Sequence, residues 1–203
     1  KQEVIRRYFR YRCEYVMGLT DKETVQRVEL LIKDFNLDLE YRRVVEPART
    51  AAIKGLESGK GNEGIFCGAA MELGNGTIVT GNNSPKFHAA SSLILHAIKN
   101  LAEIPDKIKL LPPNIVESVR NLKTKVLNEK TLSLDLVETL IALSISATGN
   151  PAAQLAMEKL EELQGCEVHM THIPTPGDEA GLRRLGVNLT SDPNFSTKDL
   201  FIS

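Results

Sequence analysis

The chain has 203 residues, with 25 Lys and Arg against 26 Asp and Glu, and a net charge of −1 at pH 7. This near-neutral balance gives no electrostatic basis for nucleic-acid binding, because nucleic-acid-binding domains generally carry a basic excess. No run approaches the roughly 20 apolar residues that a membrane span requires. The length allows one large core, or one core with an appendage. We therefore expect no nucleic-acid partner and no membrane partner.

Cysteine usage and the N-terminus indicate the cellular context. Cys13, Cys67 and Cys166 are an odd number at wide spacing, which favours a reduced, cytoplasmic protein over a disulfide scaffold. The N-terminus is charged and amphipathic, unlike a signal peptide. Because the chain starts without a methionine and directly in a helical pattern, we interpret it as the C-terminal part of a longer protein.

Residues 1–58 are predicted to form a helical N-terminal extension. Thr20 and Glu23 have the spacing of a capping box for the second of its helices. The polar, glycine-rich segment 58–62 is the best linker in the chain, and we place an α/β domain beyond it, over residues 64–203. Apolar periodicity predicts helices over residues 1–17, 21–36 and 44–56.

Beyond the linker the pattern changes to strands and helices. Gly74-Asn75-Gly76 is a strong hairpin signal. Ser133 is expected to cap a helix that is apolar nearly all round and therefore buried. A hairpin followed by strand–helix alternation predicts an α/β fold of three layers, with helices on the faces of a mixed sheet. Strands are expected over 65–73, 77–80, 107–111, 166–173 and 187–190, and helices over 88–102, 114–127, 136–145, 151–164 and 178–185.

The order hairpin, helix, strand, helix resembles the cytidine-deaminase fold. Zinc deaminases carry His-x-Glu at the helix after the hairpin and Pro-Cys-x-x-Cys at the next helix. These positions here read His88-Ala89-Ala90 and Pro112 to Glu117, without the glutamate or either cysteine. One hypothesis is thus a deaminase-like scaffold without the zinc site. His169 and His172 are three residues apart on a strand and point to opposite faces, so we expect no metal there.

Polar residues at loops and helix starts are candidates for a ligand site at one sheet edge. Gly81 to Lys86 leaves a strand and leads into a helix, whose N-terminal amides are able to meet an anion; the simpler interpretation is a connecting turn. No catalytic residue is assigned. The ligand-binding candidates are Asn82, Ser84, His88, Asn150, Gln154, His169, Thr171 and Asp178.

Several sequence motifs resemble those of one bacterial family. The most specific are Asn150 to Leu160, which reads Asn-Pro-Ala-Ala-Gln-Leu-Ala-Met-Glu-Lys-Leu, and Arg184 to Pro193. On these residues the chain resembles the C-terminal region of the family known as domain of unknown function 1846, or uncharacterised protein family 0371. The resemblance implies a nucleotide-binding α/β domain N-terminal to this segment, with no cofactor in the segment itself. It supplies no catalytic residues.

Two functions remain open, and whether the protein is an enzyme is uncertain. In the first, this domain shapes an interdomain cleft with the missing N-terminal domain, or mediates self-association into a homo-oligomer, without carrying a complete active site. The apolar faces of residues 1–36 are then expected to be partly exposed. In the alternative, it is the substrate-binding half of an enzyme acting on a nucleotide-like or phosphorylated small molecule.

Overall fold

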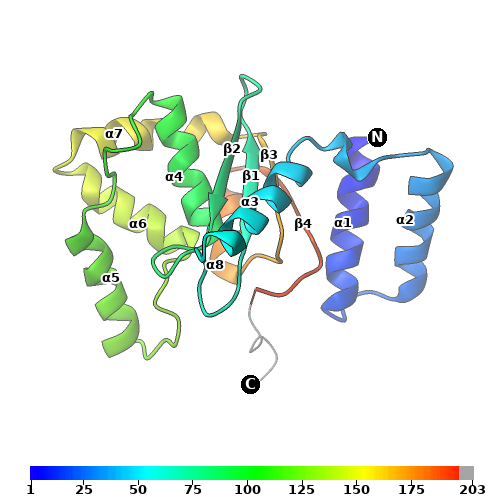
Figure 1. The fold of residues 1–203 in the computed structure, drawn as a ribbon, viewed down its shortest axis with the longest axis horizontal. Helices are drawn as coiled ribbons and strands as arrows, with labels where there is room; N and C mark the ends of the chain where they lie inside the picture. Colours follow the sequence, from blue (N-terminus) through cyan, green and yellow to red (C-terminus); the bar gives the residue numbers. More distant parts are fainter. Residues whose placement is uncertain (197–203) are drawn as a thin grey trace.

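Helices cover both faces of a four-stranded mixed sheet in residues 1–196, the part of the chain that the computed structural model describes (Figure 1). The strand order is β2-β1-β3-β4. The first strand, β1 (Gly68–Glu72), is antiparallel to both β2 (Ile78–Asn82) and β3 (Glu167–Met170), and β3 is parallel to β4 (Asn188–Ser191). The predicted α/β class, with a mixed sheet and a helical N-terminal extension, is confirmed.

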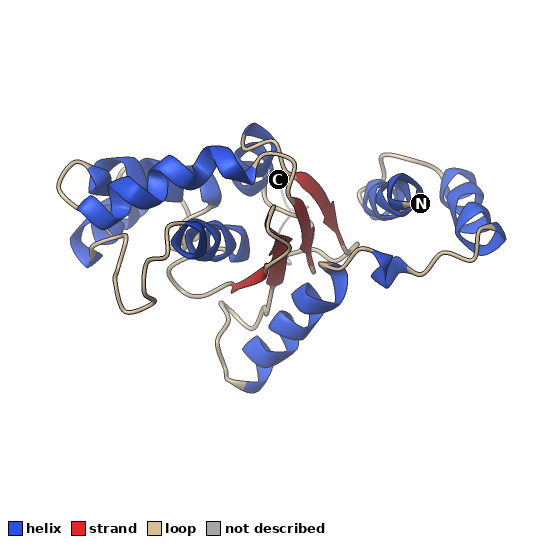
Figure 2. Ribbon diagram, turned by 90° about the horizontal axis from the view of Figure 1, so that it is seen from above, coloured by secondary structure: helices blue, strands red, loops and turns tan. Residues whose placement is uncertain are grey.

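The two faces of the sheet contact different helices. α3 (Val45–Glu57) packs on one face, and α4 (Ala89–Leu101) packs on the other (Figure 2). Two glycines allow these close approaches, since a Cβ on Gly68 would lie 2.2 Å from the Ala48 carbonyl oxygen of α3, and a Cβ on Gly81 would lie 2.3 Å from the Leu93 amide of α4.

The main core lies on the α4 side of the sheet. Its fully buried side chains include Met71 of β1 and Leu93 of α4, packed with residues of the later helices. Aliphatic burial of this kind contributes about 1.5–3 kcal/mol for each large side chain. The later helical elements are α5 (Pro113–Lys125), α6 (Leu136–Ala147), α7 (Pro151–Met157), the 3-10 helix η2 (Glu158–Leu163) and α8 (Pro176–Arg184).

A helical hairpin lies beside β4, at the edge of the sheet (Figure 1). It consists of α1 (Gln2–Val16) and α2 (Lys22–Asp34), followed by the 3-10 helix η1 (Leu39–Tyr41). Ile5 and Phe9 of α1 form a small core with α3. The cap of α2 is Asp21, whose carboxylate accepts the Thr24 amide, so the prediction of a Thr20 cap was wrong. The predicted domain boundary at 58–64 stays a prediction.

Two further local predictions are corrected by the structure. Segment 107–111 is not a strand, because side chains of Ser146 and Asn150 donate to the carbonyls of Leu110 and Lys109 and replace a sheet neighbour. The deaminase-like topology, which used that strand, stays a prediction. The cap of α6 is Asp135, in a capping box with Glu138, and not Ser133.

The apolar helix α6 is only partly buried. Ile141 and Ile145 lie one turn apart and are 55% and 50% exposed, whereas Leu136 and Leu143 are buried. An apolar sequence therefore predicted more burial for this helix than the structure has. Within residues 1–196, no helix combines the length and apolar character needed to cross a bilayer.

Candidate functional site

A cavity of about 470 Å³ lies where three helices begin. The residues that cap α4, α6 and α8 are His88, Asp135 and Thr175, and all three line it. Cys67, just before β1, and Met170, at the end of β3, line it from the sheet. Converging helix N-termini and loop residues at one end of a sheet are the usual surroundings of a ligand site in an α/β fold.

His88 and Asp178, which both line this cavity, form a hydrogen-bonded pair. Asp178 is 2% exposed, and its Oδ2 lies 2.8 Å from Nδ1 of His88 and accepts the Thr175 hydroxyl at 2.8 Å. Its Oδ1 accepts the backbone amide of Leu136 at 2.9 Å. Both carboxylate oxygens are thus engaged. Because Nδ1 of His88 donates to the carboxylate, Nε2 is the atom left to exchange a proton.

The environment of His88 favours its protonated form. Burial acts to lower the pKa of His88, but the hydrogen bond and charge of Asp178, with help from Asp135, outweigh burial and raise the pKa above its ordinary value of 6.5. A histidine whose second ring nitrogen is free to gain or lose a proton suits general acid or base work. Its Nε2 makes no hydrogen bond within the part of the chain that the structure describes.

The other ionisable groups make the cavity acidic. Its one lysine, Lys123, is buried, and its ammonium donates to Glu138 at 2.8 Å and to the Ser133 carbonyl at 2.9 Å. That cation is therefore already neutralised. Such a lining favours an uncharged polar or cationic ligand over a phosphate. The carboxylates that line the cavity are those of Glu63, Glu129, Asp135 and Asp178.

Cys67 and His172 complete the polar lining without an obvious chemical role of their own. Burial, with the charge of Asp178, raises the pKa of Cys67 to about 12, so the thiol is protonated and is a poor nucleophile. Burial lowers the pKa of His172, whose Nδ1 lies 2.9 Å from Thr171 Oγ1. Residues 1–196 contain no group of three or more His, Cys, Asp or Glu side chains arranged to hold a metal ion.

Three of the eight predicted ligand-binding residues line this cavity: Ser84, His88 and Asp178. The Ser84 hydroxyl oxygen accepts the amides of Lys86 and Phe87, which shapes the turn into α4. Among residues 1–196 the hydroxyl hydrogen of Ser84 has no acceptor, so this hydroxyl is able to donate to a ligand.

The other five predicted residues lie outside the cavity. Asn82 donates to the Ala51 carbonyl of α3 at 2.6 Å, and Gln154 is exposed on α7. Each of the remaining three has a structural partner in the fold. Asn150 caps α7, Thr171 Oγ1 accepts the Gly68 amide, and His169 is fully buried with Nδ1 2.9 Å from Thr190 Oγ1.

Sequence reasoning missed other lining residues. Asp135 and Thr175 carried a readable signal, because each precedes a helix and is of the type that caps one. Lys123 carried no such sequence signal, since a lysine on an amphipathic helix is normally exposed to solvent. Asn83 was indistinguishable from a turn residue, yet its side chain joins the Cys67 amide to the Ile65 carbonyl.

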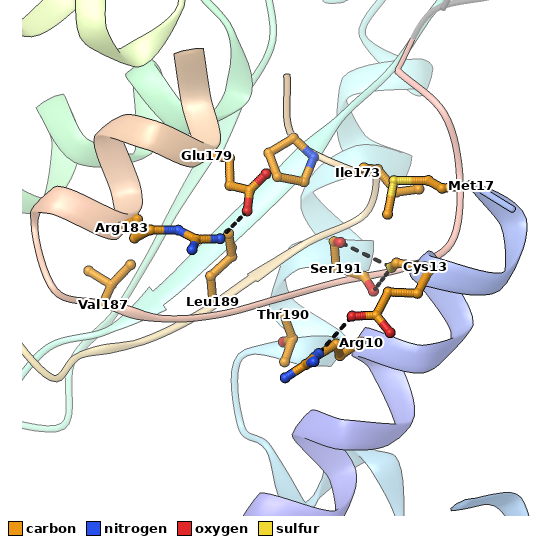
Figure 3. Close-up of a pocket in the computed structure, with 12 residues that line it drawn as sticks. Arg10, Cys13, Met17, Ile173, Glu179, Arg183, Val187, Leu189, Thr190 and Ser191 are labelled. Atoms are coloured by element: carbon orange, nitrogen blue, oxygen red, sulfur yellow. Dashed lines mark hydrogen bonds and ion pairs between the residues drawn. The ribbon is translucent and has the colours of Figure 1, made fainter. Parts of the chain in front are cut away.

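A second cavity, of about 560 Å³, separates α1 from α8 and β4 (Figure 3). Its charged side chains are paired within their own helices, Arg10 with Glu14 on α1 and Arg183 with Glu179 on α8. The Cys13 thiol donates to the Ser191 carbonyl at 3.2 Å. The charges that line it are thus balanced, and this cavity is a weaker candidate.

The fold and the cavity define a three-layer α/β domain with a helical extension and a polar cavity lined by carboxylates. The profile of the family described as "Domain of unknown function DUF1846, C-terminal" matches residues 40–201. The chain belongs to this family, as the sequence motifs predicted.

The chain is similar to curated proteins named "UPF0371 protein". The chain is 46% identical over 201 residues to the relative from Clostridium botulinum (strain Alaska E43 / Type E3) and 43% identical over 201 residues to that from Clostridium tetani (strain Massachusetts / E88). Each match covers 99% of this chain and 40% of the relative. The chain therefore spans well under half the length of the curated relatives that it matches.

Proposed function

We propose that this domain forms one wall of a ligand-binding cleft that the remainder of the protein completes, and that His88 exchanges a proton with the ligand bound there. The observation that carries the proposal is the engagement of Asp178, whose two oxygens hold Nδ1 of His88, the Thr175 hydroxyl and the Leu136 amide. A histidine fixed in this way presents Nε2 in one orientation. Preorganisation of this kind is what acid–base chemistry on a bound ligand requires.

The acidic lining specifies the class of ligand. An enzyme acting on a nucleotide-like molecule would place the uncharged part of that molecule, such as a nucleoside, against His88, because the neighbouring carboxylates repel a phosphate. The cavity volume of about 470 Å³ falls within the range of small-molecule sites, about 300–1,000 Å³.

The exposed apolar face of α2 supports an interdomain arrangement. Leu31 and Phe35 lie one turn apart and are 42% and 62% exposed, and Leu30 is 56% exposed. This exposure agrees with the expectation for residues 1–36. The chain spans 40% of the length of its relative, so much of the full-length protein is available to cover this face. A second copy of the protein is the other candidate occupant.

Nucleoside binding to the full-length protein tests the ligand site. Calorimetric titration of adenosine and cytidine is expected to show binding that weakens by roughly tenfold or more in His88→Gln, since a hydrogen bond to a charged group is lost. His96→Gln, on the exposed side of α4 and outside this cavity, serves as the control and is expected to bind normally. Unchanged binding in His88→Gln, or no binding of either nucleoside at millimolar concentration, contradicts the proposal.

Charge insertion on α2 tests the interdomain face. In the full-length protein, the double variant Leu31→Glu/Phe35→Glu is expected to be cleaved faster by protease between the domains. Its molecular mass from sedimentation is expected to stay that of the wild type. A lower mass instead supports self-association. Lys22→Glu, nine residues before Leu31 and therefore on the opposite side of the helix, is the control. Wild-type proteolysis and mass in the double variant contradict both candidates.

A further inference from the structure

We propose that a third cavity, of about 630 Å³ between α4 and α5, binds a small molecule that carries an anionic group beside a flat apolar portion. This site is separate from the His88 cavity and does not depend on the function proposed for it. The turn before α4 divides the two, since Ser84 and His88 line the His88 cavity while Lys86 and Phe87 line the cavity between α4 and α5.

The two cavities have opposite charge. Cationic side chains outnumber carboxylates in the lining of the third cavity, whereas carboxylates outnumber cations around His88. A concave surface of one sign concentrates ligands of the other sign. The cations are Lys86, Lys99, Lys109 and Arg120, and the carboxylates are Asp106 and Glu117.

Lys99 is the most informative of these residues. Its side chain is buried, with 9% of the residue exposed, and its ammonium donates to the backbone carbonyl of Asp106 at 2.8 Å. No carboxylate of residues 1–196 lies within 4 Å of that ammonium. A buried lysine is normally paired with an acid, and an ammonium has three donors. An anion in the cavity would supply the missing counter-charge.

Arg120 adds a second under-used cation. Its Nε is buried without a hydrogen-bond partner, and its ion pair with Glu117 spans 3.4 Å to a carboxylate whose side chain is 60% exposed. An exposed pair of this length contributes little to stability. The guanidinium therefore retains donors for a phosphate or a carboxylate, which it is well shaped to hold.

Apart from His96 and Asn114, the remaining lining is apolar, and side-chain hydrogen bonds hold one wall of it in place. Leu95 of α4 and Val116 of α5 both line the cavity, and Leu110 and Leu111 line it from the segment before α5. Asn150 donates to the Lys109 carbonyl at 3.1 Å and so supports this wall from α7. Cations beside apolar side chains match a ligand with an anionic group on a flat ring.

Calorimetric titration of the full-length protein with phenyl phosphate, benzoate and benzyl alcohol tests this site. We expect both anions to bind and benzyl alcohol, which lacks the charge, to bind at least roughly tenfold more weakly. Lys99→Met and Arg120→Met are each expected to weaken binding of the anions by roughly tenfold or more. Glu117→Gln, which removes a competing carboxylate, is expected to tighten it. Lys54→Met, an exposed lysine of α3, and His88→Gln are expected to leave it unchanged.

Several outcomes overturn the proposal. These are failure of both anions to bind at millimolar concentration, equal binding of benzyl alcohol, or wild-type binding in both cation variants. Loss of binding in His88→Gln alone would assign the anion to the other cavity and also overturns it. Glu117 is exposed, so Glu117→Gln gives a result even if Lys99→Met fails to fold, and weaker binding in that variant contradicts the site.

Discussion

Asp178 Oδ2 lies 2.8 Å from Nδ1 of His88, across 90 residues of sequence. The pair joins the start of α8 to the start of α4, and the second oxygen of Asp178 accepts the Leu136 amide at the start of α6. One buried carboxylate thus links three helix N-termini around the cavity. The same contacts that orient His88 also hold the wall of the site together, so its chemistry and its stability are coupled.

Asp178→Asn is expected to lower the free energy of unfolding by about 1–3 kcal/mol, because hydrogen bonds to a buried charge are lost. The pKa of His88 in the folded protein is raised above its ordinary value of 6.5. The contribution of the His88–Asp178 pair to stability is therefore fully present below pH 6.5. It is lost as the pH rises through the pKa that His88 has in the folded protein. Denaturant titrations at several pH values should show that the variant lacks this decline.

The neighbouring carboxylate of Glu179 provides the control for that variant. Glu179 is exposed and pairs with Arg183 on the surface of α8. Glu179→Gln should change the free energy of unfolding by less than about 1 kcal/mol. If Glu179→Gln and Asp178→Asn lowered the free energy of unfolding equally, the lost stability would come from the charge at the helix N-terminus and not from the buried pair.

A second buried carboxylate predicts resistance to acid. Burial acts to raise the pKa of Asp192, but His169 and the two hydrogen bonds from Arg49, at 2.7 and 3.0 Å, outweigh burial and lower the pKa to about 2. This stabilisation is present above pH 3.8, the ordinary pKa of an aspartate, and is lost as the pH falls through about 2. Arg49→Met should cost roughly 1 kcal/mol at pH 7, reduced by solvent screening of the half-exposed arginine.

Denaturant titration of Arg49→Met at pH 7 and pH 2 checks this expectation. The difference from the wild type should shrink as the pH approaches 2. Arg43→Met removes an exposed pair with Glu72 and should have little effect at either pH. A constant difference across the range would show that Arg49 acts through packing and not through charge.

His169 is expected to have the opposite pH dependence to His88. Burial lowers the pKa of His169 below its ordinary value of 6.5. Stability that depends on neutral His169 is present above pH 6.5 and is lost as the pH falls below it toward the folded pKa. His169→Phe keeps a ring against Phe9, whose ring centroid lies 4.8 Å away, and should flatten the loss below pH 6.5 in denaturant titrations. A slope equal to that of the wild type would contradict this.

Gly68→Ala tests the contact between α3 and the sheet. An added Cβ would lie 2.2 Å from the Ala48 carbonyl oxygen and 2.5 Å from the Ala52 amide. Overpacking against backbone is expected to cost about 1–3 kcal/mol or more. Gly74→Ala is the matched control, because nothing lies within 4 Å of its Cβ position. Similar melting temperatures for the two variants would argue against this packing.

Much of the fold was predictable from local patterns. The Gly74-Asn75-Gly76 hairpin and the apolar periodicity of the helices are properties of short segments, and both are present in the structure. The irregular structure of segment 107–111, where a strand was expected, was not predictable. Its carbonyls accept hydrogen bonds from Ser146 and Asn150, which follow them by 36 or more residues. Sequence patterns carry no information on such distant partners.

The site was less predictable for the same reason. His88 and Asp178 were each a reasonable candidate, but nothing local indicated that they meet. His169 was expected near a crevice, yet it is fully buried between Phe9 and Thr190, because the helical extension covers that end of β3. The excess of cations over acids between α4 and α5 is visible only after the two helices are brought together.

Titration of His88 by NMR most directly tests whether this residue is a proton-exchanging group held by Asp178. The imidazole carbon-bound protons of His88 in the full-length protein should report a pKa above 6.5, and Asp178→Asn should lower it. In the same spectra His169 and His172 should titrate below 6.5. A His88 pKa at or below 6.5, or one that Asp178→Asn leaves unchanged, would contradict the role assigned to this pair.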